Sequence, residues 1–207
     1  MSTTSRFQRP ELSDDRRRGL VFIAITTLIM WVSEIIDSIK GVDLDQYGVR
    51  PRHLDGLDGI LWQPFLHGGF DHLIGNTVPY VVLGGMIALS GFVRVVSVFV
   101  IVALIGGIGT WIIAPENTIH IGASGVVFGF AAYLVARWIY TRSLTHVFAG
   151  VLVCAVWGGA LLGGLVPTDG ISWQGHLFGG LGGLFAAFLL DGRDRRKVRS
   201  GRGRAFA

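Results

Sequence analysis

The stretch Ile121-Gly122-Ala123-Ser124-Gly125-Val126-Val127-Phe128-Gly129 places one serine between glycines, at the start of an apolar segment that continues to about Ile139. A hydroxyl group buried in hydrocarbon is unfavourable unless it is hydrogen-bonded, so Ser124 is a functional candidate. The small glycines leave room for a substrate backbone to approach its oxygen. The same glycines are also typical of close helix packing in a membrane, where a serine bonds a backbone carbonyl. Both interpretations predict a membrane helix here.

The composition of the whole chain agrees with a membrane protein. Hydrophobic residues make up 51% of the 207 residues, charged residues make up 15%, and the mean hydropathy is +0.56. Charged residues account for about a quarter of an ordinary globular chain, so a soluble domain is excluded. Six spans of about 20 residues need roughly 120 residues, which this length accommodates. We therefore expect an all-α polytopic membrane protein, a bundle of six transmembrane helices.

Six apolar segments follow one another along the chain, at about 19–36, 70–89, 93–114, 121–139, 146–166 and 173–190. The first follows three arginines, as in a signal peptide, but it is long and no small-residue cleavage site follows it, so we expect a retained span. The expected domains are a basic tail at 1–18, a membrane domain at 19–191 and a second basic tail at 192–207. We expect both tails to be flexible.

The distribution of basic residues predicts the orientation in the membrane. The net charge is +4 and the arginines gather in the two tails and in the second–third and fourth–fifth loops. The connectors 115–120 and 167–172 contain no lysine or arginine, and only the long first loop is ambiguous, with Lys40, Arg50 and Arg52 against four aspartates. By the positive-inside rule both termini are cytoplasmic, and the plasma membrane is the expected location. Anionic lipid headgroups explain the basic tails better than nucleic acid does, so no nucleic-acid partner is expected.

This orientation brings four polar residues to one depth. The second, fourth and sixth spans begin on the outer side, and His72, Asn76, Ser124 and His176 lie near those starts. Serine is a weak nucleophile that needs an adjacent base, and an imidazole such as His176 can take its proton. His72 and Asn76 lie four residues apart on one helical face, where both could donate to an oxyanion.

Two alternatives bear on the base. An acidic partner for the histidine is not expected inside the second, fourth or sixth span, so a Ser-His dyad is favoured over an Asp-His-Ser triad. His120 is a rival base four residues before Ser124, although a connector favours a solvated side chain. Taken singly, each polar residue could have an ordinary capping, packing or interfacial role.

Three motifs together resemble the rhomboid family of intramembrane serine proteases. These are Gly122-Ala123-Ser124-Gly125, the pair His72-x3-Asn76 and His176-x2-Gly179-x3-Gly183. The resemblance implies Ser124 as nucleophile and His176 as general base, with His72, Asn76 and the Ser124 backbone N–H as the oxyanion hole. It also implies that His67 steadies the first loop, and that the neighbours of the site play structural roles: Gly122, Gly125, Phe128 and Gly179.

The chain departs from the family pattern at two places. The Trp-Arg pair that many members carry early in the first loop is not evident, because Asp58-Gly59 stands at about that place. The aromatic residue four positions after the nucleophile, often tyrosine, is Phe128, which could stack beneath His176 but offers no hydroxyl group. The first departure concerns the packing of the loop, and neither one removes a catalytic group.

The sequence thus predicts an intramembrane serine endopeptidase. It would cleave transmembrane segments of other proteins near their outer ends, where small residues stand at the cut and glycine or proline weakens the helix. Membrane lipids are further partners, and no metal or organic cofactor is implied. The alternative is a non-catalytic rhomboid-like protein that binds clients, or a small transporter. The glycine pairs of 146–166 favour that span as the mobile wall through which substrate enters, whereas close packing of the same glycines would make it rigid.

Overall fold

The computed structural model describes the backbone of residues 12–204 and the side chains of residues 12–192. Within that part the long helices are α1 (Asp14–Asp37), α3 (Phe70–Ala88), α4 (Phe92–Ile113), α5 (Ser124–Thr141), α6 (Leu144–Gly163) and α7 (Trp173–Arg204). Four short helices occupy the first loop: η1 (Asp45–Tyr47), η2 (Leu54–Gly56), α2 (Gly59–Trp62) and η3 (Gln63–Phe65). Every named element is helical, so the expected all-α class is confirmed.

Five helices among the described residues are long and apolar enough to cross a membrane: α1, α4, α5, α6 and residues 173–192 of α7. The chain is therefore a multi-pass membrane protein. The expected second span, α3, is not among the five, because Asp71, His72, Asn76 and Pro79 lower its hydropathy. The count of six crossings stays a prediction.

The two ends of the bundle differ from the expected tails. Helix α1 begins at Asp14, so residues 14–18 belong to it, and residues 1–11 lie outside the described residues. Helix α7 continues beyond the expected end at Leu190 as far as Arg204, so the second expected tail is helical where it is described. Residues 205–207 again lie outside the described part.

Glycines set the distance between α5 and α7. A Cβ atom on Gly179 would lie 2.1 Å from the carbonyl oxygen of Gly125, and one on Gly183 would lie 2.0 Å from that of Gly129. Real Cβ atoms do not approach oxygen so closely, so the two backbones cross with no room for a methyl group. This crossing lies directly below the first residues of both helices, where Ser124 and His176 stand.

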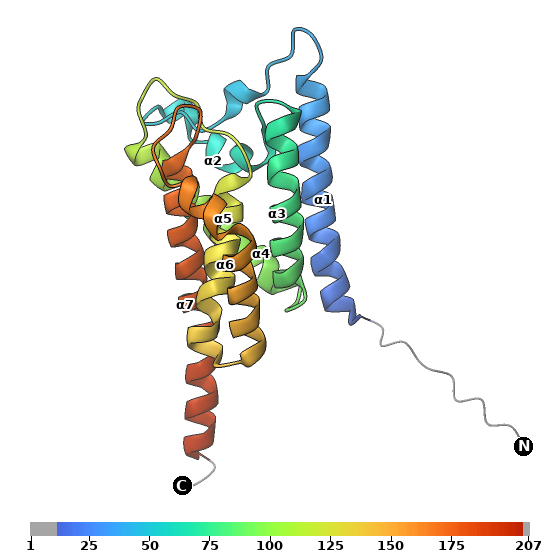
Figure 1. Ribbon diagram of the computed structural model, residues 1–207, viewed down its shortest axis with the longest axis vertical. Coiled ribbons are helices and arrows are strands. Elements are labelled where there is room, and N and C mark those ends of the chain that lie inside the picture. The colour runs from blue at the N-terminus through green and yellow to red at the C-terminus, as the bar shows by residue number, and fades with distance from the viewer. Residues whose placement is uncertain (1–11, 205–207) are drawn as a thin grey trace, which may run out of the picture.

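The three longer connections gather at one end of the molecule. Figure 1 shows the first loop, the segment before α5 and the segment before α7 at that end, while the start of α1 and the end of α7 lie at the other. The first loop is fixed to the segment before α5 by two backbone hydrogen bonds of 3.0 Å between Val49 and His120. An ion pair of 2.8 Å between Arg52 and Glu116 adds a second link.

A buried ionic cluster joins the helices at the end away from the loops. The carboxylate of Asp191 on α7 lies 3.3 Å from Arg94 of α4 and 3.2 Å from Arg137 of α5. Arg137 also donates to the hydroxyl of Ser90 over 2.7 Å. Asp191 is 3% exposed and Arg137 is 8% exposed. Because buried charges are unfavourable unless they are paired, this cluster ties α4, α5 and α7 together.

Candidate active site

Ser124 and His176 lie in hydrogen-bond contact. Ser124 is the first residue of α5, and His176 lies in the first turn of α7. The Ser124 Oγ is 2.8 Å from the His176 Nε2, and His176 is 7% exposed. The close crossing of α5 and α7 brings these two helix starts together. The structure thus joins the serine and the histidine that the sequence predicts as partners.

The other contacts of His176 determine which ring nitrogen carries its hydrogen. The Nδ1 atom is 2.7 Å from the carbonyl oxygen of Gly164, at the end of α6. A carbonyl oxygen only accepts hydrogen bonds, so Nδ1 of the neutral ring donates and Nε2 is free to accept from the hydroxyl of Ser124. The ring also stacks on Phe128, with centroids 4.1 Å apart and planes at 5°.

His72 is held in the opposite tautomer. The backbone N–H of Gly68 donates to its Nδ1 over 3.4 Å, so the hydrogen of the neutral ring is on Nε2. That edge of the ring faces Gly122: a Cβ on Gly122 would lie 2.8 Å from His72 Nε2 and 3.7 Å from Asn76 Nδ2. Gly122 also has a φ of +109°, so both its conformation and its surroundings require glycine.

The side-chain amide of Asn76 has two N–H groups, of which one is used within α3. Its Nδ2 donates to the backbone carbonyl of His72 over 3.1 Å. An amide nitrogen carries two hydrogens, so the second can point elsewhere. Asn76 is 6% exposed and sits one helical turn below His72, on the same face of α3.

His67 joins the first loop to the serine turn. It is 1% exposed, and its Nε2 accepts from the backbone N–H of Ala123 over 3.3 Å. Burial, with a smaller effect of the neighbouring His72, lowers the pKa of His67 to about 4, so the ring stays neutral and can accept. Beside it, the N–H of Gly122 donates to the carbonyl of Gln63 over 2.8 Å.

The Asp58-Gly59 part of the first loop, which departs from the family pattern, packs against Gly48 through backbone atoms. Asp58 caps α2 by accepting from the N–H of Gly59 over 3.1 Å. A Cβ on Gly59 would lie 2.3 Å from the carbonyl oxygen of Gly48, so the two glycines pack backbone against backbone. A large side chain at either position would force this part of the loop open.

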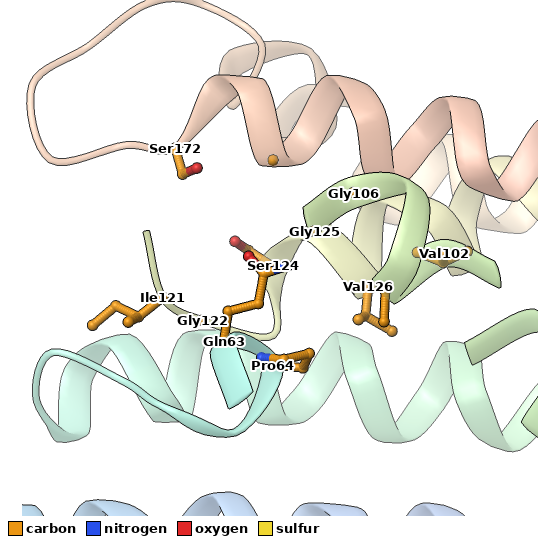
Figure 2. Close-up of a pocket in the computed structure, with 12 residues that line it drawn as sticks. Gln63, Pro64, Val102, Gly106, Ile121, Gly122, Ser124, Gly125, Val126 and Ser172 are labelled. Atoms are coloured by element: carbon orange, nitrogen blue, oxygen red, sulfur yellow. The ribbon is translucent and has the colours of Figure 1, made fainter. Parts of the chain in front are cut away.

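Two cavities meet at Ser124. The larger, of about 680 Å³, opens between the loops and is lined by polar groups of three helices, among them Asp71, His72, Asn76, Ser124 and His176. The smaller, of about 10 Å³, is the size that one water molecule occupies. In Figure 2 the side chains of Ser124 and Ser172 point into the smaller cavity from opposite sides, with Gln63 and Pro64 beneath.

Comparison with protein families identifies the fold. Residues 57–193, more than half of the chain, match the Rhomboid domain. The chain belongs to the rhomboid family. This confirms the resemblance that the three motifs indicated.

Similar proteins occur in mycobacteria and in Toxoplasma gondii. An uncharacterized protein of Mycobacterium tuberculosis is 39% identical to this rhomboid over 202 residues, which cover 94% of this chain and 82% of the relative. An uncharacterized protein of Mycobacterium leprae is 36% identical over 201 residues, 91% of this chain and 79% of the relative. Rhomboid-like protease 5 of Toxoplasma gondii is 29% identical over 147 residues, which cover 67% of this chain but 17% of that protein.

In this rhomboid His120 bonds to Ser172 and Thr118. Its Nδ1 lies 2.7 Å from the hydroxyl of Ser172, and its Nε2 lies 2.8 Å from the hydroxyl of Thr118. The expectation of a solvated side chain is wrong, because His120 is 8% exposed and burial lowers its pKa. A second serine–histidine pair, Ser172 with His120, thus lies beside the first. The sequence analysis did not single out Ser172, because this serine stands in a short connector and belongs to none of the three motifs.

The described hydrogen-bond partners of His176 are Gly164 and Ser124, and neither is acidic. Asp71 lies in the first turn of α3, so one acidic residue does fall within the expected second span; it is exposed at the edge of the larger cavity. Within the described residues, no group of three or more histidine, cysteine and acidic side chains could hold a metal ion. The chemistry that this arrangement allows is acyl transfer to serine.

Proposed function

We propose that this rhomboid is an intramembrane serine endopeptidase in which Ser124 is the nucleophile and His176 the general base. The observation that supports it most is the 2.8 Å contact between Ser124 Oγ and His176 Nε2, in a cavity that His72 and Asn76 also line. A serine hydroxyl next to a neutral imidazole nitrogen is the arrangement that activates serine at neutral pH.

The first half of the reaction forms an acyl-enzyme. His176 Nε2 takes the hydroxyl proton as Ser124 Oγ bonds to the carbonyl carbon of the scissile peptide. The tetrahedral intermediate then collapses, the C–N bond breaks, and the proton on Nε2 passes to the leaving amine. General base and acid catalysis of this kind contributes about 10²–10⁴ to the rate.

The negative oxygen of the intermediate needs hydrogen-bond donors. Ser124 is the first residue of α5, so its N–H has no partner within the helix and lies at the positive end of the helix dipole. The Nε2–H of His72 and the second Nδ2–H of Asn76 face the same place beside Gly122. These three donors form the proposed oxyanion hole.

The second half of the reaction consumes one water molecule. His176 takes a proton from water, the hydroxide attacks the acyl carbon, and the bond to Ser124 Oγ breaks as Nε2 returns the proton. The small cavity between Ser124 and Ser172 has the size for one such water molecule. A water molecule held there would lie next to the nucleophile.

The proposed topology has six crossings with both termini in the cytoplasm. Helix α3 packs beside α1 and α5, as the other long helices pack on one another. The start of α1 and the end of α7 lie at one end of the bundle, as an even number of crossings requires (Figure 1). The site would then face the outer side, and the substrates would be transmembrane segments with helices weakened by glycine or proline, because an intact helix shields its peptide bonds.

The test is cleavage by purified protein in liposomes that also contain a transmembrane substrate with a glycine- and proline-containing helix. The wild type should cut the substrate near its outer end. Ser124→Ala and His176→Ala should each lose at least about 10³-fold in rate. Ser143→Ala is the control, since it removes a hydroxyl group that follows the end of α5 away from Ser124, and we expect its rate to stay close to that of the wild type.

The outcomes separate the candidate functions. If Ser124→Ala cuts as fast as wild type, Ser124 is not the nucleophile. If the wild type binds the substrate helix but never cuts it, the chain is a non-catalytic client-binding member of its family.

A further inference from the structure

The C-terminal end of α6 takes part in the contacts of His176. The carbonyl oxygen of Gly164, the residue that follows the last turn of α6, accepts from His176 Nδ1 over 2.7 Å. The last carbonyls of a helix have no donor within the helix, and they carry the partial negative charge of the helix dipole. The imidazole therefore meets a negative group on the side away from Ser124.

This is the position that a carboxylate occupies in a Ser-His-Asp triad. There the acid holds one tautomer of the histidine and stabilises the imidazolium that forms when serine gives up its proton. Here Asp71 is the one acidic residue among the described residues that line the larger cavity, and it is exposed and belongs to α3. The end of α6 supplies a hydrogen-bond acceptor and a partial negative charge in its place.

The approach of α6 to His176 depends on glycine. A Cβ on Gly164 would lie 2.6 Å from Phe128 Cζ and 3.0 Å from His176 Nδ1. Phe128 is the ring on which His176 stacks, so the end of α6, the imidazole and the phenyl ring pack together with no space for a methyl group. The neighbouring Gly163 has nothing within 4 Å of its Cβ position.

The rest of this half of α6 is loosely held. The buried residues of α6 are Gly150 and Val153, both in its first half, and Trp157 and Leu161 pack against the core only in part. The Cβ positions of Gly158 and Gly159 are also open. The contact with His176 is therefore a main attachment of the outer end of α6 to the bundle.

We propose that the Gly164 carbonyl is the positioning group for His176, so that the base is oriented for catalysis only while the outer end of α6 lies against α7. The inference rests on the proposed function. A displacement of α6 would remove the acceptor from Nδ1, and the ring could then turn or exchange its hydrogen to Nε2. The protease would be inactive while α6 is displaced and would regain its base when α6 returns.

The test compares Gly164→Ala with Gly163→Ala, the same chemical change one residue apart. A small fluorophosphonate reacts with an activated serine and does not need a transmembrane helix to enter. We expect Gly164→Ala to lower the maximal labelling rate of Ser124 about 10-fold to 100-fold, with an unchanged half-saturating concentration. Gly163→Ala should label as the wild type does.

A second readout does not depend on reactivity. Nitrogen-15 NMR of histidine-labelled protein at mildly alkaline pH reports the tautomer of His176, with His176→Ala used to assign its signals. The wild type and Gly163→Ala should show the hydrogen on Nδ1, and Gly164→Ala should show it shifted toward Nε2. A protein misfolded by the extra methyl group would instead change the signals of several histidines.

Two results would overturn the inference: normal labelling by Gly164→Ala, or slow labelling with the hydrogen still on Nδ1. If the wild type does not react at all, the proposed function fails. The tautomers in the two alanine variants would then still decide whether Gly164 positions the ring.

Discussion

The crossing of α5 and α7 predicts the effect of one methyl group. In Gly179→Ala the new Cβ would lie 2.1 Å from the carbonyl oxygen of Gly125, whereas ordinary contacts begin near 3.4 Å, so the helices must separate there by about 1.3 Å. Gly125 directly follows Ser124 at the start of α5, and His176 lies three residues before Gly179 on α7. A rigid displacement would lengthen the distance between Ser124 Oγ and His176 Nε2 from 2.8 Å to about 4 Å, beyond hydrogen-bond range.

A misplacement of about 1 Å costs on the order of 100-fold in rate, and overpacking a core costs about 1–3 kcal/mol in stability. We therefore expect Gly179→Ala to remain folded and to lose about 100-fold in kcat/KM. The assay is substrate cleavage in liposomes, with thermal unfolding in detergent as the check on folding. Gly180→Ala is the matched control, because its Cβ meets nothing within 4 Å. If Gly179→Ala cleaves at the wild-type rate, the glycine crossing does not set the geometry of the site.

Four further predictions concern other parts of the molecule. Asn76→Ala removes one donor of the proposed oxyanion hole, so kcat should fall by about 10-fold to 10³-fold; a rise in KM alone would make Asn76 a substrate-positioning residue. Asp191→Ala leaves the buried charge of Arg137 without its carboxylate, so the free energy of unfolding measured in detergent should fall by about 3–5 kcal/mol; no change would mean that the cluster does not stabilise the bundle. Burial and the nearby carboxylates of Asp37, Glu34 and Asp43 raise the pKa of Asp45 from 3.8 to about 6, so the folded state prefers the protonated form and stability should fall as pH rises from about 4 through 6; Asp45→Asn should flatten this part of the thermal-unfolding profile, and an unchanged slope would assign it to other groups. Finally, with the exposed Cys154 removed, a disulfide between engineered cysteines in the C-terminal half of α6 and in α3 should block cleavage until it is reduced; cleavage at the normal rate would mean that substrate enters elsewhere.

Much of the fold follows from local sequence signals. The apolar runs predict where the long helices lie, because the length and hydropathy of each run are properties of neighbouring residues. They do not predict the polar extensions at the start of α1 and the end of α7. The common depth of Ser124 and His176 follows from the same reasoning, since alternate spans begin on the same side. Helix α3 is the exception. The polar residues near its start, which we assign to the site, lower its mean hydropathy below that of the five apolar helices.

Contacts between distant segments could not be predicted in this way. The carbonyl of Gly164 is a backbone group that every residue has, so no residue type marks its bond to His176. Glu34 lies near the end of the first apolar run and is 4% exposed, although nothing in the run itself marks this carboxylate as buried. The pairing of His120 with Ser172 is likewise decided by how two connectors meet.

The central claim is that Ser124, activated by His176, is the nucleophile, and two serine–histidine pairs in one small region make it testable by a single measurement. Purified protein is treated with a fluorophosphonate and analysed by intact mass spectrometry, and the modified residue is located by peptide mapping. The account predicts one adduct, on Ser124, that is absent in His176→Ala although the serine remains. The absence of an adduct on the wild type, or an adduct on Ser172 that persists in Ser124→Ala, would contradict it.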